Sequence, residues 1–351
     1  MILNMKNFKD LQATLTQQIE RKLSIPSQKV VDAVSEINGF FNKCLYASIV
    51  SSIQEHFPPR PSIILVEEGI DTSTPQIKII HQSAFDSWRQ IEDNSIQSII
   101  VSPPYWNLRV YDIPDVIIGG NPSCSHTFVS KGKFGSFCTH CNAWQGQYGL
   151  EPNFRLYIEH TLLWCQEAWR VLKSDGIFFL NLGDSYLHKC KLLLPSRIAI
   201  ALMDQGWILR NDNIWFKPNA TPEPHKDRLS NKFEYVLMLS KKKKYYFDLD
   251  AIREPYKIES LERSHQNGKN PGDLWAINTQ PSKLNHCAMF PWKLAERMIL
   301  CSTRLNDYIL DPFCGSGTTL AVAQRLGRKA CGIDLGYEDV QEERLSGIQK
   351  N

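Results

Sequence analysis

The sequence predicts an α/β protein with a mostly parallel central sheet that helices cover on both faces. From residue 77 onward, short apolar runs alternate with longer segments in which apolar residues recur at helical spacing. Two of the apolar runs lead into loops with hydroxyl, aromatic, acidic and glycine residues of the kinds found in ligand sites, at 102–106 and at 311–319. A chain of 351 residues with 42% hydrophobic content is long enough to bury the core of such a sheet.

The first elements follow from local patterns. Residues 76–81 predict a strand, residues 84–91 a helical turn or short helix, and residues 98–101 an apolar strand that leads into Ser102. Apolar side chains at helical spacing predict a long amphipathic helix over 153–173. Asp175-Gly176 then favours a turn into the apolar strand 177–182.

The later elements continue the alternation. A helix over 194–204 precedes Gly206 and a strand over 207–215, and the segment 233–239, four lysines and residues 245–247 predict a hairpin. Residues 250–285 are polar and irregular. The remaining expected elements are helices over 291–300 and 318–326 and strands over 308–311 and 329–334. Ligands of open parallel sheets bind beyond the carboxyl ends of the strands, so we expect the loops after residues 101 and 311 to lie side by side.

Residues 1–60 are expected to form a separate helical extension. Their apolar residues recur at helical spacing, with a break at Ser24-Ile25-Pro26 and an end at Pro58-Pro59. This extension is expected to pack against the main domain, residues 61–340, or against a second subunit. Within the main domain, residues 107–150 are expected to be an insertion, and residues 341–351 follow it as a tail.

Composition excludes several classes of protein. There is no run of eighteen apolar residues, so no membrane span is expected. The first ten residues carry charges and no apolar core follows them, so we expect no secretory signal. Most of the ten cysteines are scattered within apolar patterns, as in proteins of the reducing cytoplasm. A net charge of +3 is too small to indicate nucleic-acid binding by itself.

The stretch DPFCGSGTT, residues 311–319, follows a strand and opens a helix. Gly315 and Gly317 would allow a tight turn and a close approach of the backbone to a ligand. The next strand ends in Asp334, whose carboxylate could accept hydrogen bonds from both hydroxyls of a ribose. This pair of features favours a cofactor that contains adenosine over a simple structural turn.

The loop chemistry points to S-adenosylmethionine. The third glycine of the dinucleotide fingerprint is missing, and no Gly-Lys-Ser/Thr sequence follows, so both pyrophosphate binding and a P-loop are poorly supported. Asp311 would repel a phosphate, but it suits a cationic amino group. S-adenosylmethionine carries such a group and no phosphate.

The set of motifs resembles the amino-directed DNA methyltransferases. DPFCGSGTT with Asp334 resembles their cofactor motif, and SPPYW, residues 102–106, resembles their catalytic motif. The stretches NLGDSY (181–186), GWILRNDNIWFKPNATPEPHKDR (206–228), FEYVLMLSKKKKYYFD (233–248) and HCAMFPWKLAERMI (286–299) also match in order and spacing. The catalytic motif precedes the cofactor motif, which is the circularly permuted order of the family's β group. Glutamine methyltransferases, which share a similar Asn/Asp-Pro-Pro-Tyr motif, have the opposite order.

This resemblance implies a Rossmann-like fold that depends on S-adenosyl-L-methionine, and it assigns site residues. The implied cofactor-binding residues are Asp311, Phe313, Gly315, Gly317, Thr318, Thr319, Asp334, Phe290, Pro291 and Asp184. The chain departs from the family after His81, where Gln82-Ser83-Ala84 stands in place of an acidic residue near adenine, with Asp86 close by.

The catalytic loop is expected to hold the target base. The implied catalytic residues are Ser102, Pro103, Pro104 and Tyr105. The Ser102 hydroxyl and the Pro103 carbonyl would accept both hydrogens of an exocyclic amino group and aim its lone pair at the methyl donor. Tyr105 would stack on the base, and Trp106 would add a wall. A base in a duplex must flip out to reach this site.

Ser102 makes N4 of cytosine the preferred target. In the family, serine at this position goes with cytosine N4 more often than with adenine N6. N6-adenine methylation is the alternative, an RNA-base methyltransferase comes next, and a non-catalytic nucleic-acid-binding module of the same fold is the alternative from another class.

A zinc knuckle is expected in the insertion. Cys124, His126, Cys138 and Cys141 form a C-x-H and C-x-x-C pair at ligand spacing for a closed structural zinc site, with His140 as a substitute ligand. Two roles remain open for this insertion: contact with DNA beside the flipped base, and stabilisation of the loop without DNA contact.

Basic residues suggest where double-stranded DNA binds. The expected DNA contacts are Trp106, Arg210, Lys217, Lys226, Arg228 and Arg263. Residues 250–285 are the candidate target-recognition segment, because arginine, asparagine and glutamine suit the reading of base edges. The family also implies a cognate restriction endonuclease as a partner. Target sequence and oligomeric state are not determined by the sequence.

Overall fold

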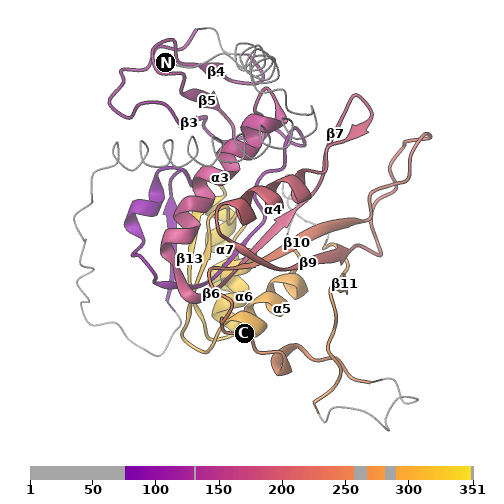
Figure 1. Cartoon of the computed structure of the whole chain (residues 1–351). Coiled ribbons are helices and arrows are strands. Elements are labelled where there is room, and N and C mark those ends of the chain that lie inside the picture. The colour runs from indigo at the N-terminus through magenta and orange to yellow at the C-terminus, as the bar shows by residue number, and fades with distance from the viewer. Residues whose placement is uncertain (1–75, 130–131, 257–266, 281–289, 349–351) are drawn as a thin grey trace, which may run out of the picture. The chain divides into compact units, whose positions relative to one another are not determined.

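A computed structural model describes residues 76–129, 132–256, 267–280 and 290–348 (Figure 1). The expected helical extension, residues 1–60, lies outside these ranges, as does Arg263.

An eight-stranded sheet forms the centre of the described part, with the strand order β1-β13-β12-β2-β6-β10-β9-β11. Its strands are β1 (Ile77–His81), β2 (Ile96–Val101), β6 (Leu172–Leu182), β9 (Ile208–Phe216), β10 (Phe233–Ser240), β11 (Leu274–Ala276), β12 (Tyr308–Asp311) and β13 (Lys329–Asp334). The first five strands in this order run parallel, β10 is antiparallel to β6 and β9, and β11 is parallel to β9. The predicted mostly parallel α/β sheet is confirmed.

Helices cover both faces of this sheet (Figure 1). They are α3 (Phe154–Val171), α4 (Leu194–Asp204), α5 (Trp292–Ser302), α6 (Thr318–Arg325) and α7 (Glu338–Ile348), with short 3-10 turns η1 (Ser87–Gln90) and η2 (Asp250–Ile252). Successive side chains of a strand point to opposite faces. Ile99 and Val101 accordingly pack in a cluster with residues of α3 and α4, whereas Ile100 packs with residues of α5 and α6.

Strand β2 is buried on both faces and pairs with β12 beside the site. All six residues of β2 are buried. Ile309 and Leu310 of β12 pair with Ser98 and Ile99 of β2, so these two strands are neighbours. Their carboxyl ends therefore open at the same edge of the sheet, and the predicted juxtaposition of the two loops is confirmed.

Three local predictions were wrong. Asp175 and Gly176 lie within β6, where the pairing with β2 shifts register, so they form an irregularity in a long strand instead of a turn before it. β10 pairs with β9 and β6, and residues 245–247 form no strand, so the hairpin is made by β9 and β10. The segment 250–285 contains strand β11, which extends the sheet.

The expected insertion has its own small sheet. Strands β3 (Val116–Ile118), β4 (Ser136–Phe137) and β5 (Trp144–Gly146) pair in the order β3-β5-β4. A separate two-stranded hairpin consists of β7 (Tyr186–Leu187) and β8 (Cys190–Lys191). No helix within the described ranges has the length and apolar character needed to cross a bilayer.

The expected C-terminal tail, residues 341–351, is helical as far as Ile348. It continues helix α7, which begins at Glu338. The Nε2 atom of Gln341 donates to the carbonyl of Gly315 at 2.6 Å, and Arg344 donates to the Ser316 hydroxyl at 3.0 Å. Helix α7 thus braces the glycine-rich loop.

Candidate active site

A cavity of about 380 Å³ lies where the carboxyl ends of β2, β6, β12 and β13 meet. Its walls include the two loops singled out by the sequence. The expected site residues that line it are Ser102, Pro103, Pro104, Tyr105, Lys217, Phe290, Asp311, Phe313, Gly315, Thr318, Thr319 and Asp334. The insertion also contributes to this wall, through residues that include Gln147 and Tyr148.

The glycine-rich loop adopts the turn that its sequence predicts. Gly315 and Gly317 have positive φ values of 49° and 76°, a backbone region that favours glycine. The Asp334 carboxylate accepts hydrogen bonds from the backbone N–H of Gly315 at 2.7 Å and of Gly336 at 3.0 Å. A carboxylate has about four acceptor positions, so Asp334 retains capacity for ligand hydroxyls on its cavity side.

Asp311 is a buried acid at the cavity floor. Burial raises the pKa of this carboxyl to about 7, hydrogen bonds from Thr319 and from the Phe313 backbone oppose the shift, and the negative charge of Asp334 adds to it. A carboxylate under such desolvation is stabilised by any cation that enters the cavity.

Aromatic rings contribute to the lining of the cavity. The ring of Phe313 stacks on Tyr148 at a centroid distance of 5.4 Å and meets Trp164 edge-on at the same distance. Phe290 lies near Trp215, with their ring centroids 6.5 Å apart. The cavity therefore combines apolar planar surfaces with the three carboxylates of Glu234, Asp311 and Asp334.

The catalytic-motif loop is tightly supported. The Tyr157 hydroxyl donates to the Pro104 carbonyl at 3.0 Å. A Cβ atom on Gly149 would lie 3.1 Å from Pro104, and one on Gly183 would lie 2.7 Å from the ring of Tyr105. Both glycines permit a close approach that a larger side chain would prevent.

A polar network surrounds Ser102. Its hydroxyl lies 3.0 Å from the Tyr105 hydroxyl and accepts from Asn181 Nδ2 at 3.1 Å. The Tyr105 hydroxyl donates to Glu234 Oε2 at 2.6 Å. The other carboxylate oxygen of Glu234, Oε1, pairs with the ammonium group of Lys217.

Four of the residues expected to hold the cofactor or the base lie outside the cavity lining: Gly317, Trp106, Asp184 and Pro291. Trp106 is only 4% exposed and donates from its ring to the Glu151 carbonyl, so the expected wall at the base is wrong for this residue. Asp184 accepts from the backbone N–H of Ser185 and Leu194, and it supports the start of α4 instead of lining the cavity. Pro291 precedes α5 as its N-cap and also lies outside the cavity lining.

After His81, the residues that stand in place of the family's acidic residue line the cavity. Gln82 and Ala84 line the cavity, whereas Asp86 does not. Burial raises the pKa of Asp86, and the charge of Arg89 opposes this shift.

The expected DNA-binding residues have different surroundings. Arg210 donates to the Tyr245 hydroxyl at 2.8 Å, and Arg228 pairs with Glu223 at 2.6 Å and lies over the ring of Tyr186. Lys226 is exposed. Lys217 lines the cavity, where its ammonium group pairs with Glu234.

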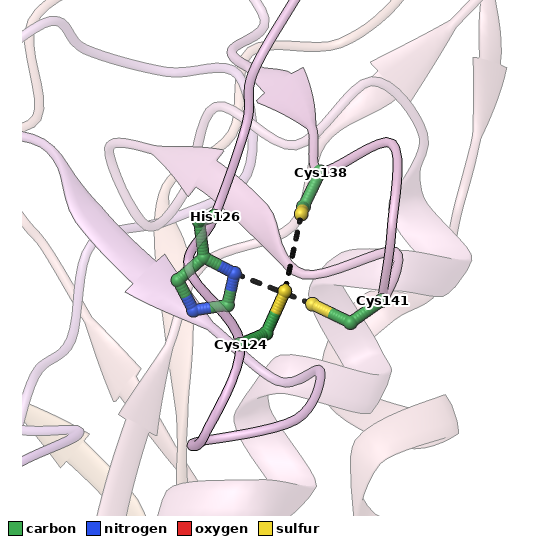
Figure 2. A group of neighbouring side chains, drawn as sticks. All are labelled: Cys124, His126, Cys138 and Cys141. Atoms are coloured by element: carbon green, nitrogen blue, oxygen red, sulfur yellow. Dashed lines mark hydrogen bonds between the residues drawn. The ribbon is translucent and has the colours of Figure 1, made fainter.

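The cysteine and histidine side chains of the insertion come together (Figure 2). The ligand atoms of Cys124, His126, Cys138 and Cys141 all lie within 4.8 Å of one another. The Cys124 and Cys138 sulfur atoms are 3.9 Å apart, and Cys141 Sγ is 3.3 Å from His126 Nδ1. Metal–ligand bonds of about 2.0–2.3 Å in a tetrahedron give such separations of about 3.5–3.8 Å.

Sequence reasoning missed Asn181, Glu234 and Tyr148 as cavity residues. Asn181 is a polar residue within an otherwise apolar run, and Glu234 is a charge at the start of another, so both carried a detectable signal. Tyr148 lies in the polar insertion and carried none.

Comparison with known proteins identifies the family. The model of the DNA methylase family matches residues 96–343, most of the chain. The chain belongs to the DNA methylase family. Among relatives of this DNA methylase, the Type II methyltransferase M.SmaI of Serratia marcescens is 32% identical over 310 residues, which cover 80% of this chain and 94% of that protein. The Type II methyltransferase M.Cfr9I of Citrobacter freundii is 33% identical over 294 residues, covering 75% of this chain and 85% of that protein.

Solved structures share the fold of this DNA methylase. The PvuII DNA methyltransferase, described as cytosine-N4-specific, matches with a TM-score of 0.56 and 20% identity over 79% of this chain and 93% of that chain. TTHA0409 of Thermus thermophilus, in complex with S-adenosyl-L-methionine, matches with a TM-score of 0.51 and 22% identity over 78% of this chain and 95% of that chain. At these identities the likeness concerns the fold.

Proposed function

We propose that this DNA methylase transfers a methyl group from S-adenosyl-L-methionine to the exocyclic N4 of a cytosine flipped out of double-stranded DNA. The observation that carries the proposal is the position of the Ser102 hydroxyl, at the end of β2 and on the wall of a cavity that also holds the glycine-rich loop. The serine at this position favours cytosine over adenine by family resemblance, and PvuII methyltransferase, which has a similar fold, is described as cytosine-N4-specific.

The chemistry needs an acceptor beside the amino group. The lone pair of an exocyclic amino nitrogen is delocalised into the ring, which makes the nitrogen a weak nucleophile. Ser102 can accept one of its hydrogens and hold the nitrogen in a fixed orientation. The bound cofactor would supply the methyl group, and the amino nitrogen would release one of its two protons to solvent while Ser102 holds it in place.

The residues present fit the proposed cofactor. S-adenosyl-L-methionine supplies an electrophilic methyl group on a sulfonium sulfur. Asp334 would accept the ribose hydroxyls, Asp311 would receive the cationic amino group, and Phe313 would contact the apolar part. TTHA0409, which has a similar fold, was solved with this molecule.

We further propose a structural zinc ion held by Cys124, His126, Cys138 and Cys141. Backbone N–H groups of His140 and Cys141 donate to the Cys138 sulfur, an arrangement that stabilises a thiolate ligand. Four protein ligands leave no open position, so the ion would hold the loop instead of taking part in catalysis. The β3-β5-β4 sheet is followed by Gln147 and Tyr148 in the cavity wall, so the ion would also stabilise that wall.

The DNA partner is proposed from basic residues outside the cavity, the exposed Arg210 and Lys226 and the partly buried Arg228. Arg263 stays a prediction. A cognate restriction endonuclease is proposed as the functional counterpart, because M.SmaI and M.Cfr9I are named Type II methyltransferases. The division into a helical extension, catalytic domain, insertion and target-recognition segment also stays a proposal.

The product of the reaction tests the target base. We expect that incubation with unmethylated plasmid DNA and S-adenosyl-L-methionine yields N4-methylcytosine, detected by mass spectrometry after digestion to nucleosides. N6-methyladenine as the only product would contradict the choice of cytosine. Total RNA incubated in parallel serves as the control, and methylation of RNA alone would favour the RNA-base alternative.

Cofactor affinity should depend on pH through Asp311. Because the pKa of this carboxyl is about 7, it is mostly ionised at pH 8 and mostly neutral at pH 6, where it no longer attracts a cation. We expect affinity for S-adenosyl-L-methionine, measured by calorimetry, to fall up to about tenfold between these pH values. For Asp311→Asn, the affinity should fall less between pH 8 and pH 6 than it does for the wild type. Asp212→Asn changes an exposed aspartate and should show the same fall as the wild type. An Asp311→Asn variant with the affinity and pH profile of the wild type would contradict the assignment.

Metal content tests the zinc proposal. Protein purified without chelator should contain about one zinc per chain, and Cys124→Ser should lose most of it because a closed site needs all four ligands. Cys190→Ser is the matched control, since Cys190 is an exposed thiol outside the cluster. Less than about half an equivalent of zinc in the wild type would refute the site.

A further inference from the structure

Four neighbouring strands bring a connected polar group to the cavity. Ser102 follows β2, Asn181 lies in β6, Glu234 in β10, and Lys217 follows β9, and these strands are adjacent in the order β2-β6-β10-β9. Tyr105 of the catalytic-motif loop lies at the centre of the group, and all five residues line the cavity. We refer to these residues as the Ser102 network.

The hydrogen-bond directions in the Ser102 network follow from the number of hydrogens. Tyr105 has one hydroxyl hydrogen, and it donates this hydrogen to the carboxylate of Glu234, which can only accept. Burial, together with the charge of Glu234, raises the pKa of Tyr105 well above its usual range, so the hydroxyl stays protonated. In the 3.0 Å contact between Ser102 and Tyr105, the serine must therefore be the donor.

The direction of the Ser102 hydrogen determines what Ser102 offers to a ligand. Its hydrogen points to Tyr105. Asn181 Nδ2 lies 3.1 Å from the serine oxygen and shares its two hydrogens among this oxygen, the Tyr105 hydroxyl at 2.6 Å and Glu234 Oε2 at 2.7 Å, so it uses at most one lone pair of Ser102. A serine oxygen has two lone pairs. The second one remains for the cavity, where Ser102 can act only as an acceptor.

We propose that Glu234 is a positioning residue that, through the Tyr105 hydroxyl, fixes Ser102 as a hydrogen-bond acceptor toward the target base. This inference rests on the proposed function. An acceptor matches the amino group of cytosine, which carries two hydrogens, and it repels the carbonyl oxygen that uracil and thymine carry at the same place. The Ser102 network would thus contribute to base discrimination as well as to rate.

Lys217 fixes the orientation of the Glu234 side chain. Its ammonium group pairs with Oε1, and the two side chains are only 19% and 14% exposed. A glutamine at position 234 would have to turn its carbonyl oxygen toward Lys217, since an ammonium group and an amide NH₂ group are both donors. Its NH₂ group would then face Tyr105 and reverse the hydrogen-bond directions as far as Ser102.

The first test is the rate of methyl transfer. In single-turnover assays with tritiated S-adenosyl-L-methionine and unmethylated plasmid DNA, Glu234→Gln should lower the rate constant at least about tenfold. Its affinity for S-adenosyl-L-methionine should stay within about twofold of the wild type, because Glu234 acts on the base side. Glu167→Gln, which alters another ion-paired glutamate outside the cavity lining, is the matched control and should keep the wild-type rate.

A double-mutant cycle separates positioning from a general structural role. Tyr105→Phe removes the hydroxyl that carries the effect, so Glu234→Gln should cause no further loss in that background. The proposal would be overturned if the fold-reductions in rate constant of the two substitutions multiplied in the double variant. A Glu234→Gln variant as fast as the wild type would overturn it as well. Failure of the wild type itself to methylate DNA would instead overturn the proposed function and this inference with it.

Binding gives a readout that is independent of activity. Methylated positions mapped by sequencing define a duplex that carries either cytosine or uracil at the target position. The wild type should favour cytosine over uracil by a larger factor than Glu234→Gln does, and any effect of the G·U mismatch cancels when the two proteins are compared. Equal preference in the two proteins would contradict a role of Glu234 in base discrimination.

Discussion

The parallel pairing of β2 with β12 is the constraint on which the site depends. It places the carboxyl end of β2, with Ser102, directly beside the carboxyl end of β12, with Asp311. Burial of β2 on both faces locks this register, since a one-residue slip would turn every side chain to the opposite face. Ser102 and Asp311, more than 200 residues apart in the chain, thereby line one cavity.

The insertion is structurally part of this arrangement. The backbone N–H of Asn107 donates to the Gly149 carbonyl at 2.6 Å, which ties the two ends of the insertion together. Glu151 bonds to His160 of α3 at 2.9 Å, and burial raises the pKa of this carboxyl while its bond to His160 opposes the shift. The Cys/His cluster therefore belongs to a module whose base is anchored in the core, next to the catalytic-motif loop.

Much of the scaffold was predictable because its signals are local. The strands 308–311 and 329–334 and the helix 194–204 have the predicted bounds, since each combines an apolar pattern with clear flanking turns. The partner of β10 was not predictable in this way. A long connection separates β9 from β10, and the apolar pattern of a strand does not specify which strand it pairs with across such a connection.

The site was predictable where the chemistry follows one strand end, as at Ser102, Gly315 and Asp334. The Ser102 network was not predictable, because residues of several strands come together in it. Glu234 and Lys217 join the Ser102 network only through the sheet order, and Trp106 is removed from the surface by its bond to the Glu151 carbonyl. Such contacts depend on tertiary packing, which local sequence patterns do not encode.

In the proposed reaction, the Ser102 hydroxyl acts on the base while a separate set of residues holds the cofactor. The most direct measurement is the single-turnover rate constant of methyl transfer for Ser102→Ala, taken together with its affinity for S-adenosyl-L-methionine. We expect the rate constant to fall about a hundredfold while the affinity stays within about twofold of the wild type. A Ser102→Ala variant that transfers the methyl group at the wild-type rate would contradict this role of Ser102.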